Sequence, residues 1–149
     1  MEKRQLGESD LSFSVVGYGT FALGGKDWQF GWGPQDENEA IYAIQHALEN
    51  GINWIDTAPV YGLGQSEILV GKAIKGRRDK IYIATKCGRT WNEKREIGRN
   101  LKKESLRKEI DDSLRRLNTD YIDLYQIHWP QPEEDIEEAW ETIQSFIKD

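Results

Sequence analysis

The sequence has few of the residues that build metal sites and disulfides, and no long apolar run. It contains one cysteine, Cys87, and two histidines, His46 and His128. A single thiol cannot form an internal disulfide, and one cysteine with two histidines gives no metal-ligand cluster, so we expect no metal. No apolar stretch approaches the ~20 residues of a membrane span. The start, Met1 to Arg4, is not followed by the apolar segment of a secretory signal. These absences favour a cytoplasmic protein without a membrane partner.

An excess of positive charge is absent as well. The chain carries 26 acidic and 20 basic residues, a net charge of −6. This balance disfavours nucleic acid and anionic membrane surfaces as partners. The 149 residues suffice for one domain with a sizeable core, so we predict a single domain over residues 1–149.

The sequence does contain a regular alternation of short apolar strands and amphipathic helices. A turn within residues 4–14 predicts a small hairpin. Helices are predicted from a capping box at Asp36, over residues 66–75, over about 102–117, and after Pro132. Strands are predicted at residues 15–20, at the segment that ends in Asp56, and at residues 81–86 and 121–128. The pattern predicts an α/β protein with a hairpin and four βα units.

Polar residues follow three of these strands. One strand ends in Asp56, the next in Lys86 and the last in His128, while Tyr61 lies in the turn after the first of them. The carboxyl ends of the strands are where α/β proteins place their chemistry. An acid, an ammonium, an imidazole and a phenol brought together there predict an acid–base site.

These residues carry a resemblance to a known family. The sequence resembles the aldo-keto reductases in the order and spacing of Asp56-Thr57-Ala58-x-x-Tyr61-Gly62-x-x-x-Ser66-Glu67, Thr85-Lys86, and Asp120-Tyr121-Ile122-Asp123-Leu124-x-Gln126-x-His128. The resemblance implies a (β/α)8 barrel that reduces carbonyls with NADPH. Such a barrel takes about 250 residues, so the chain is expected to form the N-terminal half-barrel.

The resemblance also implies roles for the four polar residues. Reducing a carbonyl by hydride leaves negative charge on its oxygen, which needs a proton donor. Tyr61 would be that donor, Lys86 would lower its pKa, Asp56 would hold Lys86, and His128 would orient the substrate. The alternative is an ordinary Asp56–Lys86 ion pair at the rim of the sheet, with Tyr61 and His128 as rim residues.

The expected cofactor is NADP(H), in a site that this chain supplies only in part. The resemblance places Gly19, Thr20 and Asp56 beside the nicotinamide–ribose end. The strands that hold the adenosine phosphate in the family lie beyond the fourth unit. The Gly17-x-Gly19 pair lacks the third glycine of a dinucleotide fingerprint, which disfavours a Rossmann loop.

Three tryptophans are candidates for the wall of a substrate pocket. Trp28 and Trp32 lie in a glycine-rich loop over residues 21–34, and Trp129 follows His128. The two loop tryptophans could equally cover the underside of their own loop. The expected partner is a small carbonyl substrate, with a homo-oligomer or a complementary half-barrel as possible protein partners because the half-barrel leaves two open strand edges. A non-catalytic regulatory or binding subunit on the same scaffold is the alternative function.

Overall fold

The computed structural model describes residues 1–26 and 28–147 of the chain. The strands are β1 (Lys3–Gln5), β2 (Ser12–Ser14), β3 (Tyr18–Gly19), β4 (Trp54–Asp56), β5 (Tyr82–Cys87) and β6 (Leu124–Ile127). The helices are α1 (Glu37–Glu49), α2 (Gln65–Ala73), α3 (Lys103–Leu117) and α4 (Ile136–Phe146). Short 3₁₀ helices occupy η1 (Phe21–Gly24), η2 (Arg78–Lys80) and η3 (Glu133–Asp135).

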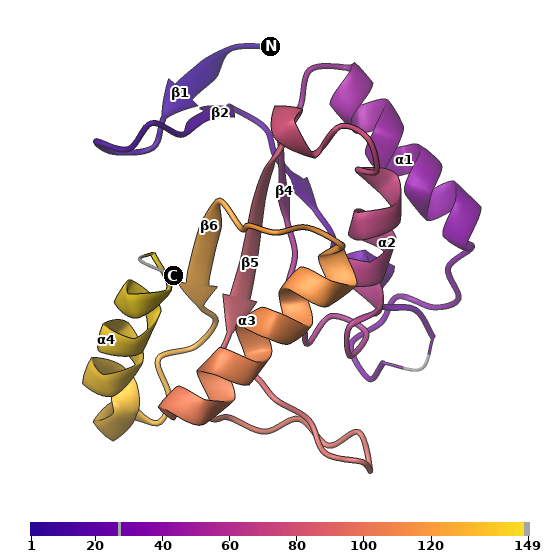
Figure 1. Cartoon of the computed structure of the whole chain (residues 1–149). Coiled ribbons are helices and arrows are strands. Elements are labelled where there is room, and N and C mark those ends of the chain that lie inside the picture. Colours follow the sequence, from indigo (N-terminus) through magenta and orange to yellow (C-terminus); the bar gives the residue numbers. More distant parts are fainter. Residues whose placement is uncertain (27, 148–149) are drawn as a thin grey trace.

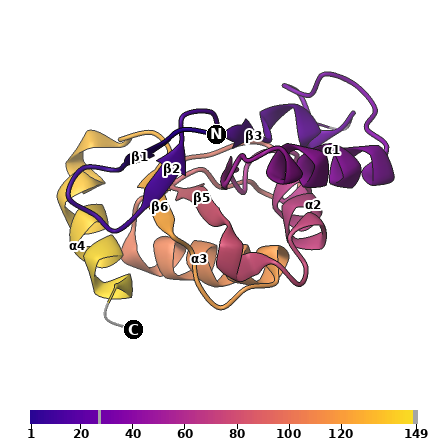
Figure 2. The ribbon, with the colours of Figure 1, turned by 90° about the horizontal axis from the view of Figure 1, so that it is seen from above.

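The four strands β3 to β6 form one parallel sheet in chain order. The helices lie in an arc on one side of this sheet, as Figures 1 and 2 show. We call the side facing the helices the outer face and the opposite side the inner face. The predicted α/β class, with one hairpin and four βα units, is confirmed, and β3 and β6 form the two edges of the sheet.

The outer face is the apolar core of the chain. Ile55 and Ile83, neighbours on β4 and β5, are fully buried against helices α1 and α2. A second cluster joins the outer side of β6 to α3 and α4, and Cys87 is fully buried within it. Because successive strand residues point to opposite faces, the residues between these core positions project from the inner face.

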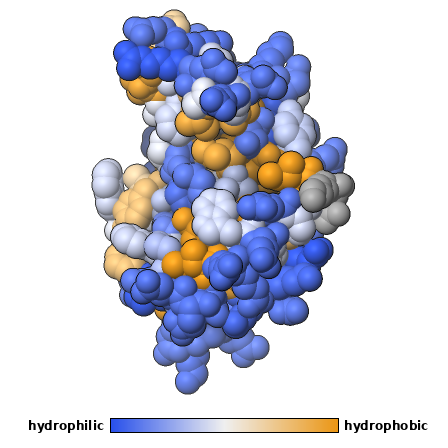
Figure 3. All heavy atoms as spheres, turned by 90° about the vertical axis from the view of Figure 1, so that its left-hand side faces the viewer, coloured by the Kyte–Doolittle hydropathy of each residue, from blue (hydrophilic) through white to orange (hydrophobic). Residues whose placement is uncertain are grey.

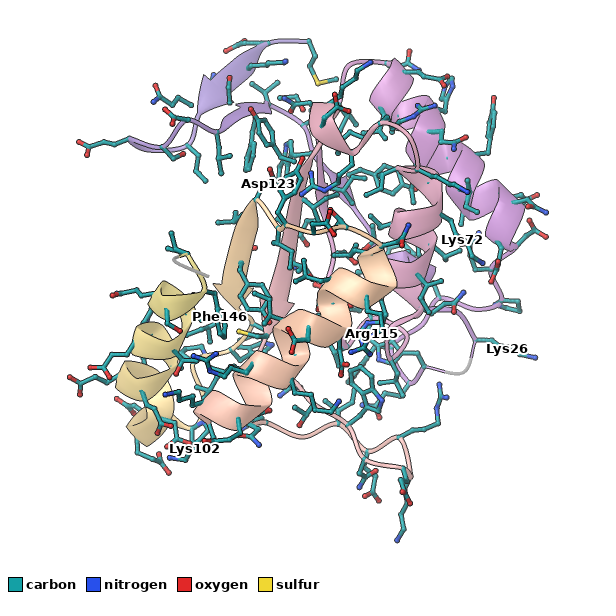
Figure 4. The ribbon with its side chains drawn as sticks, viewed as in Figure 1. Lys26, Lys72, Lys102, Arg115, Asp123 and Phe146 are labelled. Carbon is teal, nitrogen blue, oxygen red and sulfur yellow. The ribbon has the colours of Figure 1, made fainter. Side chains whose placement is uncertain are left out.

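The helix ends follow the signals in the sequence. The Asp36 carboxylate accepts a hydrogen bond from the Glu39 backbone N–H at 2.9 Å, which confirms the predicted cap of α1. Lys102, before α3, donates to Asp135 at 2.6 Å and to Glu138 at 3.2 Å, and thereby ties α3 to α4 (Figure 4). His46 is exposed on α1 and stacks on Tyr42, as expected of a surface histidine.

The hairpin β1–β2 covers the beginning of the inner face. Phe13 stacks on Trp54, with ring centroids 5.0 Å apart, and also contacts Tyr82. A side chain on Gly17 would start 2.3 Å from the Trp54 ring, so only glycine lets β3 approach β4 at this point.

Two strands are shorter than the sequence predicted. Val15 is held on the hairpin side because its N–H donates to the Glu2 carbonyl, so the sheet gains β3 only at Tyr18. Before β6, the Asp123 carboxylate accepts from Arg78 at 2.7 Å and from the Ile83 N–H at 2.8 Å. These bonds fix a turn at the beginning of β6, where Figure 4 labels Asp123.

The side of the molecule that carries the hairpin, β6 and α4 shows apolar patches between hydrophilic ends (Figure 3). A groove of about 950 Å³ lies here between α3, β6 and α4, with Tyr121, Ile122, Trp140 and Phe146 in its lining. Within residues 1–26 and 28–147, no helix is both long and apolar enough to cross a membrane.

Candidate active site

The four polar residues singled out in the sequence meet at the carboxyl end of the inner face. The Lys86 ammonium donates to Asp56 Oδ1 at 2.7 Å and to the Thr57 carbonyl at 2.9 Å. The Lys86 side chain is 13% exposed and that of Asp56 32%, so the ion pair is partly open to solvent. The pair joins the end of β4 to the end of β5.

Tyr61 is brought to this pair by a tight turn after β4. Its N–H donates to the Ala58 carbonyl at 3.1 Å, and Gly62 follows with a left-handed φ of 64°. A side chain on Gly62 would start 2.3 Å from the Gly24 carbonyl oxygen, so glycine is needed for the turn to pack on η1. The buried Tyr61 ring lies 5.2 Å from Lys86 Nζ and meets the His128 ring edge-on at 5.6 Å.

The pKa of Tyr61 departs from its expected direction. Burial, with the negative charge of Asp56 as a second cause, raises the pKa of the phenol to about 12. The net direction is therefore opposite to the expected one, because burial is the largest cause and the Lys86 ammonium is engaged by the Asp56 carboxylate and the Thr57 carbonyl. That Lys86 by itself lowers this pKa stays a prediction. At neutral pH, Tyr61 keeps its proton.

His128 is a neutral imidazole at the end of β6. Burial lowers its pKa to about 4, and the positive charges of Lys86 and Arg89 act in the same direction. Its backbone N–H donates to the Cys87 carbonyl at 3.0 Å, which fixes the strand end beside Lys86. Its Nδ1 atom is buried and has no hydrogen-bond partner among the described residues. A buried polar atom without a partner points to a bound group that would satisfy it.

The three candidate tryptophans have different surroundings. Trp28 is buried, with its ring 5.8 Å from that of Tyr61, and Phe21 lies edge-on against both rings. Trp32 is 81% exposed and its ring meets that of Phe21 edge-on at 6.5 Å, while Trp129 is 54% exposed. The structure thus gathers Trp28 and Phe21 at the site and leaves Trp32 and Trp129 on the surface. Phe21 was missed because nothing in its sequence spacing distinguishes it from its loop neighbours.

Gly19 and Thr20, the expected neighbours of the nicotinamide, have contrasting environments. Gly19 pairs with Asp56 across β3 and β4, and the position of its missing side chain meets no atom within 4 Å. Thr20 is fully buried, and its hydroxyl donates to the Asp56 carbonyl at 3.1 Å. Gly19 therefore opens a space beside Asp56, whereas the Thr20 side chain supports the strand end.

A second carboxylate, Glu67, lies on the other side of β5. It is fully buried, with one oxygen accepting from Thr85 Oγ1 at 2.7 Å and the other from Arg116 Nε at 2.6 Å. Cys87 also faces outward. Burial, with the charge of Glu109 as a second cause, raises the pKa of its thiol to about 12, so the thiol stays protonated and serves in packing. The described residues contain no group of three or more His, Cys, Asp or Glu side chains that could hold a metal ion.

Comparison with known proteins identifies relatives of this arrangement. A sequence model of the Aldo/keto reductase family matches residues 15–149. The chain is 44% identical over 148 residues to the aldo-keto reductase YhdN of Bacillus subtilis, covering 98% of the chain and 43% of that protein. It is 42% identical over 140 residues to the NADH-specific methylglyoxal reductase of Escherichia coli, covering 87% of the chain and 42% of that protein.

Solved structures give the same result. The holo form of an aldo-keto reductase from Bacillus halodurans superposes with a TM-score of 0.81 at 40% identity, covering 97% of this chain and 47% of that one. An aldo-keto reductase from Klebsiella pneumoniae in complex with NADPH gives a TM-score of 0.68 at 28% identity, covering 90% and 42%. The chain thus spans less than half the length of each of these four relatives.

Proposed function

Because this chain belongs to the aldo-keto reductase family, we propose that it supplies the catalytic half of an NADP(H)-dependent reductase of small aldehydes or ketones. The observation that carries the proposal is the convergence of Tyr61, Lys86 and His128 at one end of the inner face, with Asp56 bound to Lys86. A non-catalytic subunit would have no need for a phenol, an ammonium and an imidazole in this arrangement.

Tyr61 is the proton donor in this proposal. A bound nicotinamide would supply the hydride, and the carbonyl oxygen would then gain negative charge. An alkoxide is a far stronger base than a phenolate, so a phenol with a pKa of about 12 still gives up its proton to it. Lys86, anchored by Asp56 and the Thr57 carbonyl, places its positive charge beside the phenol as that proton leaves.

His128 orients the carbonyl. Since its pKa is about 4, the imidazole is neutral at pH 7 and has one N–H to donate. Its edge-on contact with the Tyr61 ring places two donors side by side. A carbonyl oxygen that accepts from both is held where the proton is transferred.

The residues of the site fit the nicotinamide end of the cofactor. The space beside Gly19 and the buried, unpartnered atoms Gln126 Oε1 and His128 Nδ1 lie on the inner face and offer room and polar groups. Gln126 is the partner of Lys86 across β5 and β6, which places its amide at the same rim. We expect the 149-residue chain to bind NADPH weakly or not at all, because the strands that bind the adenosine phosphate in the family lie beyond its fourth βα unit. Isothermal calorimetry tests this, and a low-micromolar dissociation constant would contradict it.

Turnover is best tested in a chimaera in which residues 1–149 replace the matching segment of YhdN. In this chimaera, Tyr61→Phe should lower the rate of methylglyoxal reduction by about 10²- to 10⁴-fold while NADPH affinity stays within twofold. Tyr42→Phe removes a phenol from the exposed face of α1 and serves as the matched control. Full activity of the Tyr61→Phe chimaera would exclude Tyr61 as the donor. Parallel assays with NADH and NADPH decide the cofactor preference.

We also propose that the 149-residue chain pairs through its sheet edges, either with itself or with a complementary half-barrel. Edge strands present unpaired N–H and C=O groups, and β3 and β6 are the edges of this sheet. Light scattering coupled to size exclusion should report a species larger than 17.3 kDa. A sharp monomer peak with cooperative unfolding would contradict the proposal.

A further inference from the structure

The loop between β5 and α3 folds back on itself as an irregular antiparallel hairpin, with one isolated bridge and no regular strand in residues 88–102. The Asn100 N–H donates to the Gly88 carbonyl, Gly98 to Thr90 and Asn92 to Glu96. A bridge pairs Trp91 with Ile97 in the same register. The hydrogen-bonded positions alternate with non-hydrogen-bonded ones, and Arg89 therefore lies directly opposite Arg99.

Cross-strand neighbours of this kind share one face and have Cβ atoms about 4.5–5.5 Å apart. Arg89 and Arg99 thus project from the same face of the hairpin as Trp91 and Ile97. Ile97 packs on the cluster that contains Tyr61, which places this end of the face beside the turn that carries Tyr61. At Trp91, the same face lies 5.8 Å from the guanidinium of Arg116. The two arginines therefore share a face with a residue that contacts the Tyr61 cluster.

Neither arginine has a carboxylate partner among the described residues. Arg89 is partly buried, and burial, followed by the charge of Arg99, lowers the pKa of its guanidinium. Like charges directly opposite each other destabilise a hairpin, and a partly buried cation without a counter-charge adds a desolvation cost. The charge of Arg89 also reaches His128, since it contributes to the lowered pKa of that imidazole. An anion bound between the two guanidinium groups would offset both costs.

We propose that Arg89 and Arg99 form an anion-binding subsite that selects carbonyl substrates carrying a carboxylate or a phosphate. The inference rests on the proposed reductase function and names its substrate class. Guanidinium groups recognise both anions through paired hydrogen bonds. Because the charge of Arg89 reaches His128, the anion would be held on the same side of the site as the imidazole that orients the carbonyl. The preferred substrate is then an aldehyde or ketone with an acidic group at its other end.

The test uses two aldehydes that differ only in charge, 4-carboxybenzaldehyde and its methyl ester. In the chimaera with YhdN, Arg89→Gln should lower kcat/KM for the carboxylate by about 10- to 100-fold and leave the ester within twofold. Arg99→Gln should have a smaller effect in the same direction, because Arg99 is exposed. Arg89→Lys, which keeps the charge, should recover part of the loss. Lys94→Gln removes one positive charge from the exposed tip of the same hairpin and is the matched control.

Several results would overturn the subsite. Equal losses for acid and ester would mean that Arg89 only maintains the hairpin, and a change confined to the KM for NADPH would assign the arginines to a cofactor phosphate. If Lys94→Gln and Arg89→Gln lowered kcat/KM for the carboxylate equally, the preference for the acid would come from the net positive charge of the loop and not from a subsite. Failure of the unmodified chimaera to reduce the ester would instead contradict the proposed function itself. Reduction of the ester through Tyr61 without any preference for the acid would refute the subsite alone.

Discussion

Two carboxylate–cation pairs lie on opposite faces of β5. The Glu67–Arg116 pair contacts the strand at Thr85, and the Asp56–Lys86 pair includes the next strand residue. On the outer face, Glu67 is fully buried and both of its oxygens are bound, one by Thr85 and one by Arg116. On the inner face, Asp56 is 32% exposed and binds Lys86 through one oxygen. The outer pair joins three elements, α2, α3 and β5, whereas the inner pair joins the ends of two strands.

The difference separates a structural pair from a functional one. Full burial with every acceptor satisfied holds Glu67 in a single arrangement, and removing one partner would leave an uncompensated buried charge. Partial exposure leaves the Asp56–Lys86 pair accessible to a ligand, beside polar atoms of His128 and Gln126 that have no partner in the described chain. We therefore expect changes in the outer pair to act on stability and changes in the inner pair to act mainly on turnover.

The largest expected effect is on stability, at the outer pair. Arg116→Met should lower the free energy of unfolding by about 3–5 kcal/mol, because it leaves the Glu67 charge buried without its cation. Urea unfolding followed by tryptophan fluorescence measures this. Arg115→Met, which removes a 73% exposed arginine of the same helix, is the control and should cost less than about 1 kcal/mol. Equal effects of the two variants would refute the structural role of the outer pair.

Changes in the inner pair should affect turnover more than stability. Lys86→Met should cost about 2 kcal/mol of stability, because solvent reaches Asp56 and screens the charge left behind. In the chimaera with YhdN, the same change should lower carbonyl reduction by about 10²-fold or more, since the phenol loses the cation beside it. A stability loss as large as that of Arg116→Met, with activity retained per folded molecule, would reverse the comparison.

The sequence predicted the inner site better than its surroundings. Asp56, Lys86 and His128 could be located because strand ends and the family motif both indicate them, and the strand alternation predicts their common face. The pKa direction of Tyr61 could not, since it depends on how deeply the turn buries the phenol and on its distance from Asp56. The strand before Asp123 was predicted too long because the carboxylate of that residue binds Arg78, a contact that spans 45 residues.

The loop that carries Arg89 and Arg99 also depends on contacts that the sequence does not reveal. Residues 88–102 have no strand periodicity, and their register depends on backbone bonds that no side-chain pattern reveals. Arg89 and Arg99 were therefore invisible as a pair, although each is plain in the sequence. Burial within a loop could not be predicted either, since Trp28 and Trp32 lie in the same loop and, of these two, only Trp28 is buried.

The smallest expected effect is on the pH dependence of the free energy of unfolding, which should differ between the inner His128 and the exposed His46. The folded pKa of His128 is about 4, against an ordinary value of 6.5, so below pH 6.5 the unfolded chain takes up a proton that the folded chain does not. The contribution of His128 to the free energy of unfolding is fully present above pH 6.5 and is lost as the pH falls toward 4. At pH 5 we expect a loss of about 1 kcal/mol relative to pH 7, roughly half of the unscreened value because the imidazole is partly exposed.

The measurement is a pair of urea unfolding curves at pH 7 and pH 5, compared between the wild type and two variants. His128→Gln should reduce the wild-type pH difference by that amount, since glutamine does not titrate. His46→Gln, which replaces the exposed histidine on α1, should leave the difference unchanged. The carboxylates that also titrate in this range are common to all three proteins and cancel in the comparison. If both variants keep the wild-type difference, then the folded pKa of His128 is close to its ordinary value. The imidazole would then be a cation below pH 6.5, and at such pH its contribution to orienting the carbonyl would be that of a charge as well as a donor.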